Sequence, residues 1–201
     1  MKGWHLWPLL LLALSCAAQA EMGISVIGAE RFGDDPTLDK DGSGPGSAQT
    51  IDIDDAVSSA LTLQYFNTSS TSYDFWVLRL ETDVSGDTTE VSLVQESLHF
   101  GGRKYWQDDA FRPYVGATVG IQRLDLGSAN HDQETLWGFT LFAGLALPLT
   151  EHVRLIGEAR MVGTVFSSDT ALGCGTEGCV WHVQSQVWSQ YDVGLGLSMQ
   201  F

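Results

Sequence analysis

The sequence predicts an all-β fold, a single eight-stranded antiparallel up-and-down β-barrel that spans a membrane. Three observations lead to this prediction. Apolar residues recur at every second position through most of the 201 residues, which is the period of a strand with two different environments. The alternating segments match or exceed the roughly 9–11 residues that a tilted strand needs to cross hydrocarbon. The last segment alternates without interruption up to Phe201.

The first twenty residues are expected to be a secretory signal peptide. Lys2 gives a positive start, WPLLLLALSCA an apolar core, and Ala18-Gln19-Ala20 a small-x-small cleavage pattern, a combination typical of cleaved leaders. The barrel domain is therefore expected to cover residues 21–201. An alternative is a lipoprotein signal acylated on Cys16, although the residues before this cysteine fit that processing site poorly.

Eight alternating segments follow in order along the chain. They are expected at Gly23–Phe32, Asp54–Phe66, Tyr73–Val84, Thr89–Tyr105, Arg112–Leu126, Thr135–Leu149, Val153–Phe166 and Val183–Phe201. The facing of the first segment is ambiguous. In the fourth, Gln95 and Glu96 interrupt the alternation, and we expect a β-bulge there.

The facing of the barrel depends on what lies between the apolar positions. In YVGATVGIQ and WGFTLFAGLALPL the opposite face carries glycine and polar residues. Alternation alone fits a water-soluble sandwich with the apolar face inside equally well. The many glycines on the polar face, the strand length and the closing strand favour a membrane barrel, with the apolar face toward lipid. After Glu21 no apolar run approaches 18 residues, so strands rather than helices would span the bilayer.

The connections alternate in length along the chain. NTSSTS, QDDAF and TEH are short, most of the others are longer, and SGDT is an exception. Short turns at one end and long loops at the other are typical of transmembrane barrels, in which the short turns are periplasmic. An even number of strands then leaves both chain ends on the periplasmic side.

The net charge and the number of cysteines restrict the kinds of partner and metal site that can be expected. The chain has 25 acidic and 10 basic residues, a formal net charge of −15, which argues against nucleic acid because phosphate binding needs a cationic surface. Beyond the leader only Cys174 and Cys179 remain, in the Gly-rich stretch GCGTEGC. We expect a disulfide that closes a small loop. A zinc site would need further ligands.

Several passages resemble a known superfamily. The closing YDVGLGLSMQF, together with FRPYVGATVGIQRL and FAGLALPLTEHVRLIGEARMVG, resembles the small eight-stranded outer-membrane β-barrels of the OmpA/OmpX type in Gram-negative bacteria. SSDTALGCGTEGC before the last strand resembles a branch of these barrels with a paired-cysteine last loop. The resemblance covers essentially all of residues 21–201 and concerns architecture and location rather than activity. No C-terminal peptidoglycan-binding domain follows the barrel, so the cell-wall anchoring of some relatives is not implied.

The resemblance implies a location and a set of partners. The location is the Gram-negative outer membrane, where the neighbours are outer-membrane lipids and lipopolysaccharide and the protein is a monomer. The barrel-assembly machinery and periplasmic chaperones would act during biogenesis. The last strand would be the C-terminal assembly signal, formed by Tyr191, Val193, Leu195, Leu197, Met199 and Phe201.

Charged residues within the strands indicate a polar lumen. The predicted lumen charge cluster comprises Arg79, Arg154, Glu158, Arg160 and Asp192, and Glu81, His99 and Arg103 share its facing. An eight-stranded barrel is just wide enough to be filled by side chains, and opposite charges there should pair, for example Arg160 with Asp192. Such a cluster could be a structural plug, which we favour, or a gate for a narrow ion path.

Aromatic residues lie mostly near strand ends. Aromatic belts at the two membrane interfaces account for most of them. The set is Tyr65, Trp76, Tyr105, Trp106, Tyr114, Trp137 and Trp188. Trp188 has the parity of the lumen and is alternatively expected inside the barrel.

The first long loop is rich in aspartate. Seven aspartates between positions 34 and 55 could hold divalent cations that bridge to lipopolysaccharide phosphates. DKDGSG, from Asp39, resembles the start of a calcium loop but lacks the later bidentate glutamate, so we expect a solvated acidic loop. No metal or cofactor is expected.

No motif indicates catalysis. Gly173–Gly178 spells G-x-G-x-x-G without the strand and helix that a dinucleotide site requires, and His131, Asp132, Glu134, His182 and Ser185 form no recognisable hydrolase motif. The sequence thus predicts an integral outer-membrane barrel with a structural, envelope or surface-interaction role and no catalysis. A small low-conductance porin-like channel is the alternative, and a lipid-modifying outer-membrane enzyme is third.

Overall fold

A computed structural model describes residues 21–33, 37–40, 48–50, 52–53, 56–86, 89–106, 111–126, 134–166, 171–175, 178–183 and 187–201. Side chains are described over 21–32, 56–82, 92–106, 111–125, 134–166 and 187–201. The predicted signal peptide lies outside the described residues. No helix in the described part of the chain is long and apolar enough to cross a membrane.

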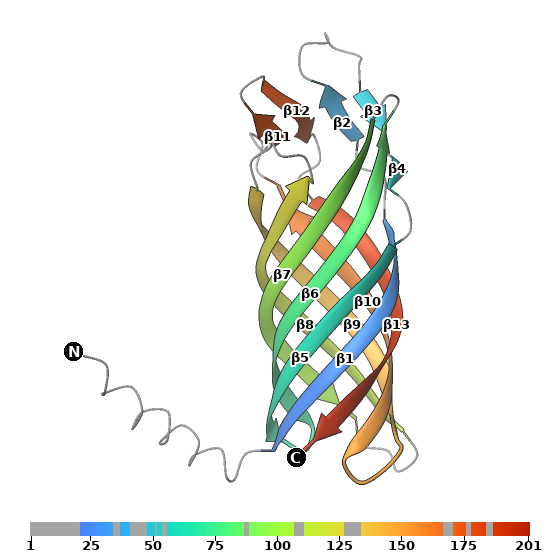
Figure 1. Ribbon diagram of the computed structural model, residues 1–201. Helices are drawn as coiled ribbons and strands as arrows, with labels where there is room; N and C mark the ends of the chain where they lie inside the picture. The colour runs from blue at the N-terminus through green and yellow to red at the C-terminus, as the bar shows by residue number, and fades with distance from the viewer. Residues whose placement is uncertain are drawn as a thin grey trace, which may run out of the picture.

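Eight long strands form one closed antiparallel barrel (Figure 1). They are β1 (Met22–Gly33), β5 (Ala56–Thr68), β6 (Thr71–Gly86), β7 (Thr89–Tyr105), β8 (Arg112–Leu126), β9 (Glu134–Pro148), β10 (Val153–Val165) and β13 (Val187–Gln200). Each strand pairs with the next of the eight, and β13 pairs back with β1. The predicted fold class and all eight strands are confirmed, with strand ends displaced by a few residues.

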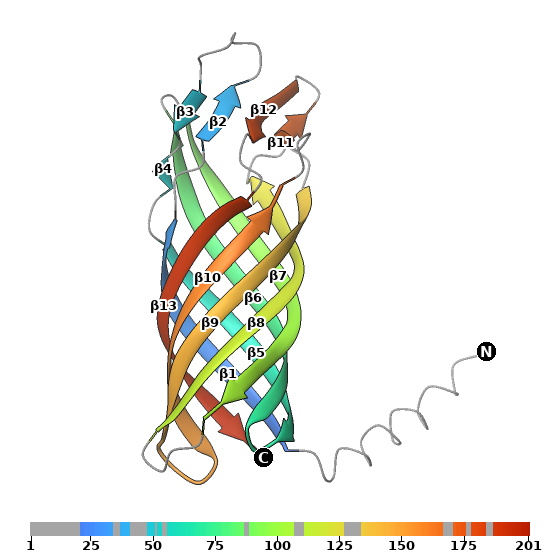
Figure 2. The same ribbon diagram turned by 180° about the vertical axis from the view of Figure 1, so that it is seen from behind.

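The register fixes how strongly the strands tilt. Following directly opposed residues once around the barrel from Gly23 leads back to Gly33, which lies ten residues further along β1. The path runs through Gln64, Asp74, Gly101, Thr118, Thr140, Val162 and Gln190. Such a stagger requires strongly tilted strands, as Figures 1 and 2 show.

One end of the barrel carries short turns and the seam between the two ends of the described chain. The β5–β6 turn at Ser69 and Ser70 and the β9–β10 turn at residues 149–152 lie at this end, which we call the turn end (Figures 1 and 2). Met22 and Phe201 exchange two backbone hydrogen bonds of 2.9 Å each across the seam. The long connections emerge at the opposite, loop end.

Parts of two long connections pair with each other at the loop end. β2 (Thr37–Lys40), β3 (Ala48–Thr50), β11 (Ala171–Gly175) and β12 (Gly178–Val183) form a small antiparallel sheet in the order β11-β12-β2-β3. A two-residue strand, β4 (Asp52–Ile53), pairs antiparallel with the loop-end part of β6. None of these strands was predicted from the sequence. Each has six residues or fewer and lies in a segment rich in glycine and polar residues, so it shows no clear alternation.

The predicted disulfide falls in this small sheet. Cys174 and Cys179 occupy directly opposed positions of β11 and β12, where Cα atoms lie about 4.5–5.5 Å apart, within the range that a disulfide spans. Their side chains lie outside the described residues, so the disulfide stays a prediction.

The two faces of the barrel wall differ in chemistry. Outward side chains are apolar and exposed, with Trp137 at 68% and Leu195 at 67%, whereas the inward face carries many fully buried polar side chains. This distribution of polar and apolar side chains is the reverse of that in a water-soluble protein. An exterior of this kind is suited to lipid. On β1, whose facing the sequence left open, Ile27 and Arg31 point inward and Val26 outward.

The bulge expected in the fourth strand is absent. The pairings of β7 with β6 and with β8 run without a register shift. Leu93 and Gln95 both point inward, whereas Glu96 points outward together with Leu98. The apparent interruption arose because an apolar residue faces the lumen and a charged one faces outward near the loop end.

Inward glycines create space for large lumen side chains. A Cβ at Gly116 would overlap the ring of Phe142, and one at Gly144 would overlap the hydroxyl of Tyr114. Glycine on the inward face therefore marks positions where a large side chain from a neighbouring strand lies directly over the backbone of the glycine.

Candidate functional site in the barrel lumen

A chain of buried ion pairs begins at β1. The Nε of Arg31 lies 2.5 Å from Oδ1 of Asp192 on β13, and its Nη2 donates to Oδ2 at 2.9 Å. The same Oδ2 accepts from the hydroxyl of Ser58 at 3.2 Å and lies 3.5 Å from Nη1 of Arg160 on β10. Asp192 thereby links β13 to three other strands, β1, β5 and β10.

The chain continues to the opposite wall. Arg160 Nε donates to Oε1 of Glu158 at 2.7 Å, and Oε2 of Glu158 lies 3.6 Å from Nη1 of Arg103 on β7. Arg103 Nε then donates to Oδ2 of Asp74 on β6 at 2.8 Å. Glu158 also accepts a 2.8 Å hydrogen bond from the hydroxyl of Tyr114.

The lumen charge chain, as we name these six residues, balances its charges. It is formed by Arg31, Asp192, Arg160, Glu158, Arg103 and Asp74, three guanidinium groups alternating with three carboxylates. Their side chains are 0–2% exposed. Charges this deeply buried persist only when each is paired, so the chain acts as one unit across the barrel.

Aromatic rings fill the lumen beside this chain toward the turn end. The Arg103 guanidinium lies 4.4 Å from the ring centre of Tyr114 and 4.8 Å from that of Phe142, in cation–π range. Phe142 packs on Trp76 at 4.7 Å, and Tyr105 on Tyr114 at 5.4 Å. The rings and the ion pairs therefore pack as one layer.

Amide side chains form a second layer toward the loop end. Arg31 Nη1 donates to the side-chain oxygens of Gln95 at 3.0 Å and Gln190 at 3.2 Å. Gln95 donates in turn to Gln122 at 3.1 Å, which also accepts from the hydroxyl of Thr164. These contacts connect β1, β7, β8, β10 and β13 on the loop-end side of the charge chain.

A few buried donors in the described lumen lack a protein acceptor. They include Nε1 of Trp76 and Nη2 of both Arg103 and Arg160. Buried polar groups of this kind are the usual places for ordered water. These donors mark the positions in the described lumen where isolated waters would bind.

Four of the five predicted cluster residues lie on the lumen side of the wall. Glu158, Arg160 and Asp192 belong to the lumen charge chain, and the predicted pairing of Arg160 with Asp192 is present at 3.5 Å. Arg103 and His99 are also buried inside, where Nδ1 of His99 lies 3.2 Å from the hydroxyl oxygens of Thr118 and Thr140.

The predicted lumen facing of Glu81 is wrong, and so is that of Arg79, the one exception in the cluster. Arg79 lies on the outer wall, where Nη1 contacts Glu96 at 2.9 Å and Nη2 contacts Glu81 at 3.7 Å. The Arg79, Glu96 and Glu81 side chains are 55%, 48% and 66% exposed. The error arose because β6 has apolar residues on both faces here, with Val77 outside and Leu78 inside. The sequence pattern of this strand therefore does not show which face points to the lumen.

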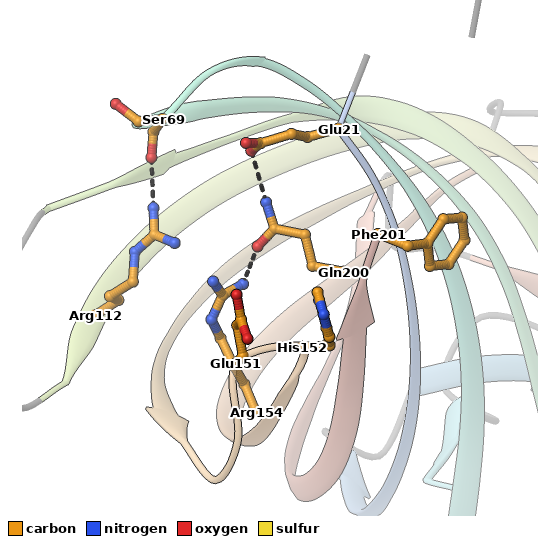
Figure 3. Close-up of a pocket in the computed structure, with 8 residues that line it drawn as sticks. All are labelled: Glu21, Ser69, Arg112, Glu151, His152, Arg154, Gln200 and Phe201. Carbon is orange, nitrogen blue, oxygen red and sulfur yellow. Dashed lines mark hydrogen bonds between the residues drawn. The ribbon is translucent and has the colours of Figure 1, made fainter. Parts of the chain in front are cut away.

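Arg154 lies at the mouth of the barrel rather than in its centre. It donates to the side-chain oxygen of Gln200, and the Gln200 amide donates to Glu21 at 2.8 Å (Figure 3). Arg112 points into the same mouth and donates to the carbonyl of Ser69. A pocket of about 380 Å³ opens here, lined by Glu21, Ser69, Arg112, Glu151, His152, Arg154, Gln200 and Phe201. Its lining contains two arginines and two glutamates.

Two members of the charge chain escaped the sequence analysis. Arg31 lies on the strand whose facing was ambiguous. Asp74 was recognisable in principle, because a lone carboxylate between Tyr73 and Phe75 in a membrane strand has to face the lumen. They are the two ends of the charge chain, where Arg31 pairs with Asp192 and Asp74 pairs with Arg103.

The aromatic residues divide differently from the prediction. Trp76, Tyr105 and Tyr114 point into the lumen and are buried, so they belong to no interface belt. Trp106, Trp137 and Tyr65 are exposed on the outside, as a belt requires, and Trp188 is buried in the lumen, as its parity suggested. The six assembly-signal residues of β13 and its end all face outward.

Other predicted groups are described only in part. His131, Asp132, Ser185 and much of the aspartate-rich loop lie outside the described residues, and only the backbone of His182 is described. Among the described side chains, no group of three or more histidines, cysteines or acidic residues could hold a metal ion.

Comparison with known proteins rests on structure. No family model and no curated protein sequence matches the chain. The crystal structure of Neisserial surface protein A (NspA) is similar with a TM-score of 0.62 and 12% identity, over 90% of this chain and 97% of that one. The solid-state NMR structure of outer membrane protein AlkL in DMPC lipid bilayers is similar with a TM-score of 0.55 and 17% identity, over 91% of this chain and 90% of that one. The chain thus has the fold of the small eight-stranded outer-membrane β-barrels, the superfamily that its sequence resembles.

Proposed function

We propose that the protein is a non-catalytic structural component of the Gram-negative outer membrane, a filled barrel that holds its long loops at the cell surface. The observation that carries this proposal is the lumen charge chain with its aromatic and amide layers. These side chains occupy the lumen from β1 to β7, and an eight-stranded barrel leaves little further width.

The exterior supports the membrane location. A continuous set of exposed apolar side chains surrounds the described barrel, and the outward charges of Arg79, Glu96 and Arg123 lie toward the loop end. At that level they would meet the phosphates of lipopolysaccharide, our proposed surface partner. The protein would act as a monomer.

The last strand supports assembly by the barrel-assembly machinery with help from periplasmic chaperones. β13 closes the barrel against β1 and presents its apolar residues outward. Replacing Phe201 with serine should lower the amount of heat-modifiable, folded protein in the membrane fraction. Unchanged assembly of this variant would remove the signal from the proposal.

Conductance tests the filled lumen against the porin-like alternative. The protein, folded and inserted into planar bilayers in about 1 M KCl, should give a flat current trace, because the charge chain and the ring layer block ion passage. Phe142→Ala, which removes a central ring, should raise the conductance, whereas Leu141→Ala on the outer face should not. Regular current steps from the unaltered protein would favour the channel.

A lipid-modifying activity is tested separately. The mass spectrum of lipid A from cells with and without the protein should be identical, since we propose no catalytic role. A new lipid A species that depends on expression would overturn this part of the proposal.

A further inference from the structure

The outer wall has a groove near the turn end, across β6, β7 and β8. Its volume is about 600 Å³. It is lined by Asn67, Thr71, Ser72, Tyr73, Gly102, Arg103, Lys104, Val115, Gly116 and Ala117. Most of these residues belong to the outward set, whereas the Ser72 and Arg103 side chains are buried inside the barrel. The groove therefore opens toward the surrounding medium.

Missing side-chain volume creates the groove. Gly102 is an outward position of β7 directly opposite Tyr73 on β6 and Ala117 on β8, so no side chain stands between Tyr73 and Ala117 at this level of the outer surface. A Cβ at Gly102 would have only the carbonyl oxygen of Ser72 nearby, at 3.1 Å. The gap is thus open space on the outer surface.

The sides of the groove are apolar. Tyr73 stacks on Phe100 with ring centres 6.3 Å apart, and on Tyr65 at 6.4 Å, which makes one firm aromatic side. Val115 and Ala117 form the other side and are exposed. A slot with these walls in a lipid-facing surface matches a hydrocarbon chain.

The turn-end rim of the groove is polar and cationic. The Lys104 ammonium donates to the hydroxyl of Ser70 at 3.0 Å, and Thr68 and Thr71 pair their hydroxyls at 2.6 Å. No carboxylate is among the lining residues. A cation that contacts one hydroxyl group, with two further hydroxyl groups in the same turn, complements an anionic phosphate.

From this arrangement we propose that the groove binds one anionic glycerophospholipid of the leaflet at the turn end. An acyl chain lies over Gly102 between Tyr73 and Val115, and the lipid phosphate contacts Lys104 and the turn hydroxyls. The proposal rests on the proposed membrane location and adds a defined lipid site to it.

Native mass spectrometry of the folded chain with palmitoyl-oleoyl phosphatidylglycerol tests the site. Gly102→Leu should fill the slot and Lys104→Gln should remove the charge, so each should lower the fraction of protein that retains one lipid at least fivefold. The matched controls are Gly28→Leu, at an outward glycine with nothing within 4 Å, and Lys104→Arg, which keeps the positive charge at the rim. Both should retain lipid within twofold of the unaltered protein.

Two further probes separate the parts of the lipid. Dioleoylglycerol, which lacks the phosphate, and glycerol 3-phosphate, which lacks the chains, should each be retained at least fivefold less than phosphatidylglycerol. Equal retention of either probe, or equal retention of phosphatidylglycerol by Gly102→Leu, would overturn the site.

The membrane location is tested by a different readout on the same samples. Insertion into vesicles and a heat-dependent shift in gel mobility report the folded membrane barrel. If the unaltered protein inserts but the variants bind lipid normally, only the groove proposal fails. If the unaltered protein stays soluble without detergent or vesicles, the proposed function fails with it.

Discussion

The protein holds two sets of ion pairs on opposite faces of the same wall. In the lumen, Asp192 contacts Arg31 and Arg160 with almost no exposure, whereas Glu96 on the outside contacts Arg79 with about half of each side chain exposed. The contacts are alike in chemistry and similar in length. They differ in what surrounds them when one partner is lost.

That difference decides what each set contributes. A buried charge that loses its partner has no solvent to replace it, so breaking the pair is costly even though forming it gains little over an apolar core. An exposed charge is rehydrated, and its pair contributes little. We therefore expect the lumen pairs to contribute more to the stability of the closed barrel than the outer pair.

The largest effect is expected from Asp192→Ala. Arg31 and Arg160 would both lose a carboxylate, so the free energy of unfolding in lipid vesicles should fall by about 3–5 kcal/mol. Urea titration followed by tryptophan fluorescence measures it. A loss below about 1 kcal/mol would mean that water reaches these charges, and the comparison between the two faces would fail.

An intermediate effect is expected from Gly144→Ala. The added methyl group would overlap the Tyr114 hydroxyl and the carbonyl of Gly157, and such overpacking typically costs about 1–3 kcal/mol. The same urea titration applies. Gly28→Ala, on the outer face with open space around it, serves as the control and should change stability by less than about 0.5 kcal/mol.

The smallest effect is expected from Glu96→Gln. This change removes the charge that pairs with Arg79 while keeping the shape of the side chain. Because the pair is half exposed, the free energy of unfolding should fall by less than about 1 kcal/mol. A loss as large as that of Asp192→Ala would show that the outer pair lies in a dry environment, deep in the hydrocarbon.

Sequence analysis succeeded where the two faces differ chemically. On β8, β9 and β13 the outward face is mostly apolar, whereas glycine and polar residues recur on the inward face beside a few large apolar ones such as Phe142. For these strands both the strand and its facing were predictable. Sequence analysis failed where both faces are apolar or the strand is short. Arg79 was assigned inward because Val77 and Leu78 give no contrast, and Trp76 was assigned to a belt for the same reason.

The sequence predicted that charged residues line the lumen, but it did not predict which of them pair with one another. Alternation placed Glu158, Arg160 and Asp192 on one face, but their partners come from strands up to about 160 positions away in the sequence, as the pair of Arg31 and Asp192 shows. A barrel with a different stagger would bring other residues together at the same height.

By itself, the amino-acid sequence determined that the chain forms long amphipathic strands, how many there are and which end carries the short turns. These properties are local, because the period of two and the turn residues act over a few positions. Only the tertiary structure decided which charges meet across the lumen and which glycines admit a ring. The physical reason is that closure of the barrel and the stagger between its strands bring residues far apart in the sequence to the same height along the barrel axis.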